Sequence, residues 1–188
     1  MIAHGDLCAA ETLLLCGLQA EAPTADLHYE LGRLYHLMGR DQLALPHLSA
    51  AGAVGPAEAC AEAPVRSLLL AAWICLTNDQ LDRASGLLQE AMVRLTVPPD
   101  AELAADFAIC QAREQSLRGD LDGSNQLART LFNRPNLSPS QRGDAAWILW
   151  QNASGHGPDE AAQAWLTAAR ELAAEAWWPP QLRRLYPE

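Results

Sequence analysis

Apolar residues return every three or four positions along most of the chain, which is the spacing of an amphipathic helix. The clearest case is the stretch 27–51, where two such helices meet at Gly39. In the second of these helices Ala44, Leu48 and Ala51 fall at i, i+4 and i+7 and therefore share one face. The pattern predicts a pair of helices that turn back on each other at Gly39.

The same pattern returns more faintly three times, with predicted bends at 78–79, 118–120 and 154–158. The residues expected on the matching face of each second helix are Ala84, Leu88 and Ala91, then Ser124, Ala128 and Leu131, and then Ala161, Trp165 and Ala168. A half unit precedes them, and its helix carries Ala10, Leu14 and Gly17. We expect one domain, 1–188, made of the units 1–23, 24–56, 64–98, 100–134 and 139–176 and a C-terminal cap over 177–188.

The aliphatic composition supports helices and excludes a sheet. The chain has 35 Ala and 31 Leu but only 4 Val and 4 Ile, and aromatic residues make up 6% of it. Strands favour β-branched and aromatic residues, whereas Ala and Leu are the best helix formers. The composition predicts an all-α protein.

Charged residues exclude several functions. All 13 basic residues are Arg, so chemistry that needs a Lys ammonium, such as a Schiff base or a P-loop lysine, is excluded. A net charge of −10 argues against nucleic acid as a partner, because binding to phosphates needs a basic surface. No apolar run is long enough to span a bilayer, so we expect no membrane partner.

No catalytic, nucleotide-binding or paired-cysteine motif occurs, so we expect neither an enzyme nor a bound cofactor. The five Cys show no CxxC pair and predict buried thiols in a reducing compartment. With no basic segment before the first apolar run, we expect the cytoplasm. His28 and His36, eight residues apart, could meet a metal with Glu30 or Cys75, but they lack ligand spacing and we expect no metal site.

The first helix pair resembles the tetratricopeptide repeat. The matching positions are Leu31, Gly32, Tyr35, Ala44, Ala51 and Pro56, with Leu48 in place of Phe and His28 in place of Trp. The resemblance, to small bacterial proteins of this family, implies a right-handed α-solenoid of about four helix pairs. The anchor positions 10, 44, 84, 124 and 161 lie further apart after the first step than the family repeat of about 34 residues. An armadillo-like or other α-solenoid with repeats of roughly 40 residues is therefore the structural alternative.

In this family the first helices line a concave groove, and the resemblance implies which residues point into it. The expected groove residues are Tyr29, Arg33, His36, Arg66, Leu69, Trp73, Ile109, Arg113 and Arg142, with Ser116, Leu149 and Asn152 beside them. We expect a protein–protein interaction module, a scaffold, adaptor or chaperone, that binds a peptide or partner helix there. Tyr29 and Trp73 would anchor apolar groups, and the arginines would hold acidic groups or a C-terminus.

Two kinds of alternative stay open at this point. The arginines could merely form intrahelical pairs, such as Asp26 or Glu30 with Arg33 and Asp106 with Arg113. The chain could also be an assembly scaffold that forms homodimers through the apolar end residues 13–15 or 177–178, or an accessory domain of an enzyme whose catalytic part is elsewhere. Small bacterial secretion chaperones share its length and acidity, whereas the absence of Lys disfavours the Lys and Asn ladder that clamps a chaperone's C-terminal tail.

Overall fold

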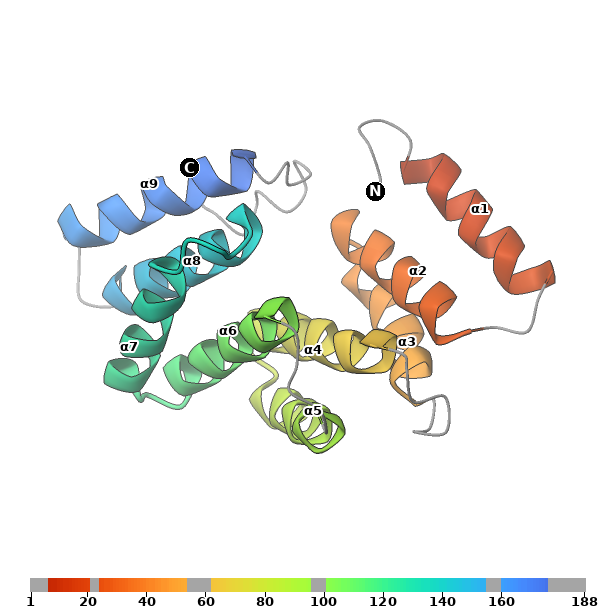
Figure 1. The fold of residues 1–188 in the computed structure, drawn as a ribbon, viewed down its shortest axis with the longest axis horizontal. Coiled ribbons are helices and arrows are strands. Elements are labelled where there is room, and N and C mark those ends of the chain that lie inside the picture. The colour runs from red at the N-terminus through yellow and green to blue at the C-terminus, as the bar shows by residue number, and fades with distance from the viewer. Residues whose placement is uncertain (1–6, 21–23, 54–61, 96–100, 155–159, 176–188) are drawn as a thin grey trace.

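A computed structural model of the chain describes residues 7–20, 24–53, 62–95, 101–154 and 160–175, which form helices and short turns (Figure 1). These residues contain no strand, which confirms the predicted all-α class. The helices found in them are α1 (Leu7–Ala20), α2 (Ala25–Leu37), α3 (Asp41–Gly52), α4 (Glu62–Thr77), α5 (Leu81–Arg94), α6 (Ala101–Leu117), α7 (Leu121–Phe132), α8 (Pro139–Ser154) and α9 (Glu160–Glu175).

Three of the turns between helices repeat the same geometry at equal intervals along the chain. Gly39, Asp79 and Gly119 have positive φ angles of 69°, 56° and 86°. In each turn the N–H of this residue donates to the carbonyl three residues earlier, and the next N–H donates to the carbonyl five residues earlier. This is the Schellman arrangement, which favours Gly and tolerates Asp at the left-handed position. The predicted bends at 39, 78–79 and 118–120 are thus present as three copies of one helix ending.

The helices follow a curved path (Figure 1). α2 packs against α4, α4 against α6 and α6 against α8, so the first helices of successive pairs form one continuous layer. Each of the second helices α3, α5 and α7 packs both on its own first helix and on the first helix of the next pair. Because α5 and α7 lie on the outside of the curve, the layer of first helices faces its inside (Figure 1).

The interface within each pair is built on the predicted alanine and leucine face. Ala44, Leu48 and Ala51 of α3 have no exposed surface, and Gly32 of α2 lies opposite Ala44 and Leu48. The corresponding buried residues of α5 and α7 are Ala84, Leu88, Ala91, Ser124, Ala128 and Leu131. These faces confirm the predicted registers of the first three second helices.

The predicted register of α9 is wrong by one residue. Ala161 is exposed and Trp165 is only half-buried, with its ring edge-on to Phe132 at a centroid distance of 5.1 Å. The residues buried on this face are Ala162, Leu166 and Ala169. Small residues neighbour each other so often in α9 that two registers fit the pattern, and Leu166 rather than Trp165 occupies the place of Leu48.

The predicted face of the N-terminal half unit also needs correction. Leu7, Ala10, Leu14 and Leu18 of α1 pack against the apolar cluster of α2 and α3. The series that begins at Ala10 therefore faces the next unit. It does not correspond to the face of α3, α5 and α7 that packs on the first helix of the same pair.

The first helices α2, α4, α6 and α8 begin within two residues of the predicted unit starts, while the division into repeats stays a prediction. The predicted cap over 177–188, most of the bend at 154–158, Pro23, Pro56 and Cys60 lie outside the described residues.

Candidate binding site on the first helices

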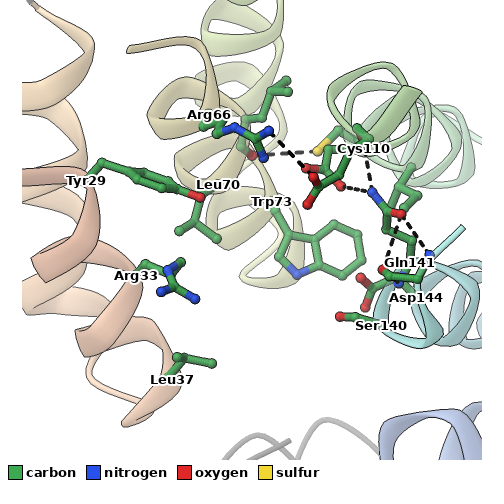
Figure 2. A pocket seen from close by; sticks show the side chains of 15 residues that line it. Tyr29, Arg33, Leu37, Arg66, Leu70, Trp73, Cys110, Ser140, Gln141 and Asp144 are labelled. Atoms are coloured by element: carbon green, nitrogen blue, oxygen red, sulfur yellow. Dashed lines mark hydrogen bonds and ion pairs between the residues drawn. The ribbon is translucent and has the colours of Figure 1, made fainter. Parts of the chain in front are cut away.

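A pocket of about 280 Å³ opens on the layer of first helices, between α2, α4, α6 and the start of α8 (Figure 2). The apolar residues that line it are Leu37, Leu69, Leu70, Trp73 and Ile109. The other lining residues are Tyr29, Arg33, Arg66, Glu102, Asp106, Cys110, Ser138, Ser140, Gln141 and Asp144. Four successive first helices therefore contribute to one site.

Six of the nine residues predicted to line the groove lie in this pocket. They are Tyr29, Arg33, Arg66, Leu69, Trp73 and Ile109. The indole of Trp73 lies between the side chains of α2 and those of α8 (Figure 2). It meets the Trp147 ring edge-on at a centroid distance of 5.7 Å, and this contact fixes its orientation within the core.

Three predicted groove residues do not line the pocket, because other contacts hold them. His36 Nδ1 lies 2.7 Å from Asp41 Oδ1. The guanidinium of Arg113 lies over the Trp147 ring, 5.1 Å from its centroid, and 3.7 Å from Asp79 Oδ1. Arg142 Nε donates to the carbonyl of Phe132 at 3.2 Å. These residues lie on the first helices as predicted, but their side chains stabilise the fold instead of facing the pocket.

The residues expected beside the groove also serve packing. Ser116 donates to the side-chain oxygen of Asn152, whose amide in turn donates to Ser124 and Asn125 at 2.9 Å each. Leu149 is 2% exposed. These groups join α6, α7 and α8 rather than face a ligand.

Both arginines of the pocket already hold carboxylates of their own chain. Arg33 donates through Nε and Nη2 to Glu30 at 3.1 and 2.7 Å, so this predicted intrahelical pair is present. Arg66 does the same with Glu62 at 3.2 and 3.0 Å, and its Nη2 is 3.6 Å from Glu102. Because their charges are engaged, these arginines form a wall of the pocket with little free positive charge.

The other predicted intrahelical pair was Asp106 with Arg113. Asp106 accepts a hydrogen bond from Gln141 at 2.7 Å, and the guanidinium of Arg113 lies near Asp79 and Trp147. Both side chains therefore make contacts with neighbouring helices and turns, which the spacing along one helix did not indicate.

The wall of the pocket formed by α6 and α8 is acidic, and the sequence prediction did not include it. Glu102, Asp106 and Asp144 line that side of the pocket. Gln141 Nε2 donates to Asp106 Oδ1 and, at 3.1 Å, to the carbonyl of Glu102, which joins α8 to α6 (Figure 2). The signal was in the sequence, since Glu102, Asp106 and Ile109 fall at i, i+4 and i+7 and must share a face.

Two titratable side chains in the pocket are held neutral. Burial raises the pKa of Tyr29 above its usual value, against the opposing effect of the Arg33 and Arg66 charges, so its phenol keeps its proton at neutral pH. Burial also raises the pKa of the Cys110 thiol, and that Sγ donates to the carbonyl of Leu69 at 3.6 Å. A protonated, buried thiol is a poor nucleophile, so Cys110 serves packing.

His28 and His36, the two histidines considered as metal ligands, each contact a different side chain. His28 Nδ1 lies 3.0 Å from His47 Nδ1 on α3, and the His47 ring also packs near Tyr35 at a centroid distance of 5.7 Å. His36 faces Asp41 instead. Within the described ranges, no three His, Cys, Asp or Glu side chains lie close enough together to hold a metal ion.

We expect acidification to destabilise the protein through His47. Burial, followed by the nearby His28, lowers the pKa of His47 below 6.5 in the folded state. The folded state therefore favours the neutral form of His47. This contribution to the free energy of unfolding is present above the unfolded pKa of about 6.5 and is lost as the pH falls through the folded pKa. Thermal unfolding measured from about pH 7 to about pH 5 should therefore show a falling Tm, with a shallower fall in His47→Gln. Identical slopes for the two proteins would contradict this role.

None of the helices in the described parts of the chain is long and apolar enough to cross a membrane. No protein-family model matches the sequence, and comparisons with curated proteins and with solved structures also give no match. The function must therefore be inferred from the geometry of the pocket itself.

Proposed function

We propose that this chain is a protein-interaction module that binds a peptide or a helix of another protein at the pocket of the first helices. The observation that carries the proposal is a single pocket, about 280 Å³ in volume, to which α2, α4, α6 and α8 all contribute. Small-molecule sites usually enclose most of their ligand, whereas this pocket is open to solvent. An open pocket on the inside of a curve suits a side chain of a bound segment.

The proposal includes a finer description of the fold, a right-handed α-solenoid of tetratricopeptide-like helix pairs. It is supported by the layer of first helices, by the three equivalent turns and by the close approach of α3 to Gly32. The interval from Gly39 to Asp79, repeated from Asp79 to Gly119, is longer than the family's usual repeat of about 34 residues. In such a stack the bound segment would lie across the first helices.

Affinity and orientation come from different parts of this pocket. Because Arg33 and Arg66 are already engaged with Glu30 and Glu62, an acidic group of the partner gains little from them. An apolar side chain placed against the half-buried Leu37 and Leu70, beside the exposed 9% of Trp73, gains more, because it removes apolar surface from water on both partners. We therefore assign the affinity to an apolar anchor, and the direction of the bound segment to the polar side chains around it.

A peptide-display selection against the purified protein tests this proposal. Leu37→Arg and Leu70→Arg each place a charged chain at half-buried positions of the pocket, and Met92→Arg makes the same kind of change at an exposed position of α5. We expect wild type and Met92→Arg to enrich the same peptides, and both pocket variants to lose them while their circular dichroism and Tm stay close to wild type. Peptides that bind the two pocket variants as tightly as wild type would place the site elsewhere.

A further inference from the structure

The packing of α1 on α2 shares one close approach with the packing of α3 on α4. A Cβ added at Gly17 would lie 3.3 Å from Leu27 Cδ2, and one added at Gly52 would lie 3.0 Å from Leu68 Cδ2. Each glycine thus lets a second helix approach a leucine near the start of the next first helix. The equivalence of Gly17 and Gly52 makes the residues of α1 up to Gly17 correspond to the residues of α3 that lie 35 positions later.

This correspondence identifies a surface of α1 that is left open. Ala9, Leu13 and Cys16 correspond to Ala44, Leu48 and Ala51, the face of α3 that is fully buried against α2. In α1 all three residues are exposed, and Leu13 is 73% exposed. Within the described residues α2 is the main neighbour of α1, and no helix covers this face. We define the α1 outer face by its residues, which are Ala9, Thr12, Leu13, Cys16 and Ala20.

The α1 outer face has no charge. The Thr12 hydroxyl donates to the carbonyl of Cys8 at 2.9 Å, so its hydrogen bond is made within the helix. Glu11, the acidic residue of α1, points toward Arg40 at 3.6 Å. The helix at the other end of the stack differs, because the exposed residues of α9 include Gln163, Thr167 and Glu171. The end of a solenoid that faces water is normally polar, as in capping repeats. The exposed residues of α9 fit this description, and the α1 outer face does not.

We propose that the α1 outer face binds a second copy of this chain, with the two α1 helices antiparallel across a two-fold axis near Leu13. Two copies that each carry a charge of −10 repel one another, and an uncharged face lets them approach. The face is also complementary to itself, because the Leu13 side chain of each copy fits between the small residues of the other. Leu48 fits against Gly32 in a similar way within the chain.

The size of this face sets the strength of the dimer. A helix of 14 residues is about 21 Å long, so the contact buries less than the roughly 800 Å² per partner of a standard interface. The dimer is therefore weak and reversible. The pocket of the first helices lies on α2, α4, α6 and α8, so it stays open in the dimer and peptide binding is independent of dimerisation.

Sedimentation velocity over about 1 µM to about 1 mM protein, in a reducing buffer that prevents disulfides of the exposed Cys8 and Cys16, tests this proposal. We expect wild type to shift from monomer to dimer with concentration. Leu13→Glu should weaken association by more than about 100-fold, because it brings two carboxylates to the centre of the contact. Val93→Glu is the matched control, since Val93 is 74% exposed on α5, and it should behave like wild type.

Several results would overturn the proposal. They are a monomer at every concentration, a wild-type dimer that Leu13→Glu leaves intact, and a dimer that Val93→Glu weakens equally. Because Leu13 is exposed, Leu13→Glu keeps the fold, and an unchanged Tm at low concentration verifies this. The Leu13→Glu monomer should still bind the selected peptides. Dimerisation and peptide binding can then succeed or fail separately, so each proposal has its own test.

Discussion

Trp147→Ala should lower the free energy of unfolding by about 3–5 kcal/mol, the usual cost of removing a large aromatic side chain from a core. Trp147 is 4% exposed on α8 and contacts both Trp73 and Arg113. Its loss leaves a cavity beside Trp73 and removes the ring that covers the guanidinium of Arg113. Arg113 is itself buried, and desolvation lowers its pKa, so it has little water to replace the ring.

Urea unfolding followed by circular dichroism measures this change. Trp165→Ala is the control with the same chemistry, because Trp165 is only half-buried against Phe132 and its removal should cost clearly less. A small domain has about 5–15 kcal/mol of stability in total, so Trp147→Ala should shift the urea midpoint strongly. Equal losses for the two variants would mean that Trp147 is not the central packing residue of the C-terminal half.

Gly32→Leu should destabilise the protein by about 3 kcal/mol or more, at the upper end of the cost of overpacking. A Cβ at position 32 would lie 2.7 Å from both Cγ and Cδ2 of Leu48 and 3.3 Å from the carbonyl oxygen of Ala44. Leu48 is completely buried and has no free space to move into. The added side chain must therefore push α3 away from α2.

Gly86→Ala is the control for Gly32→Leu. Gly86 also lies within a helix, but a Cβ there would have no neighbour within 4 Å. Alanine should raise stability by roughly 0.5–1 kcal/mol at this position, because it loses less backbone entropy on folding. The two substitutions thus have opposite expected signs in the same thermal unfolding measurement. Gly32→Leu with an unchanged Tm would disprove the close approach of α2 and α3.

The fold could be predicted where the sequence pattern admits one interpretation. Gly39 and Gly119 mark helix ends because few other residues adopt a positive φ, and Asp79 supplies the third such turn. In α3 the series one residue earlier contains His47 and the series one residue later contains Ser49, so Ala44, Leu48 and Ala51 form the one series without a polar residue. These local signals were enough to place the first three helix pairs.

The pattern failed where neighbouring residues are equally apolar. α1 has small or apolar residues at 9 and 10, at 13 and 14, and at 16 and 17, so two faces carry the same spacing. α9 has the same ambiguity at 161 and 162. In both helices only the position of the neighbouring helix decides which face is buried.

Prediction of the candidate site was limited by side-chain direction. The helical phase brought Tyr29, Arg66 and Trp73 to one pocket, but it could not show that Arg113 turns onto Trp147 and Arg142 onto the end of α7. Arginine side chains are long, and nearby aromatic rings and carbonyls attract their guanidinium groups. The acidic wall follows from the same helical phase and changes the balance of charge in the pocket.

The central claim is that a partner segment contacts Trp73 in the pocket of the first helices. Nuclear magnetic resonance of the tryptophan indole N–H groups during titration with a selected peptide measures this most directly, with Trp73→Phe to assign the signal. We expect the Trp73 signal to shift and to saturate with the peptide, while the signal of Trp165, which packs against α7, stays in place. A shift confined to Trp165, or saturation of binding without any change at Trp73, would contradict the account.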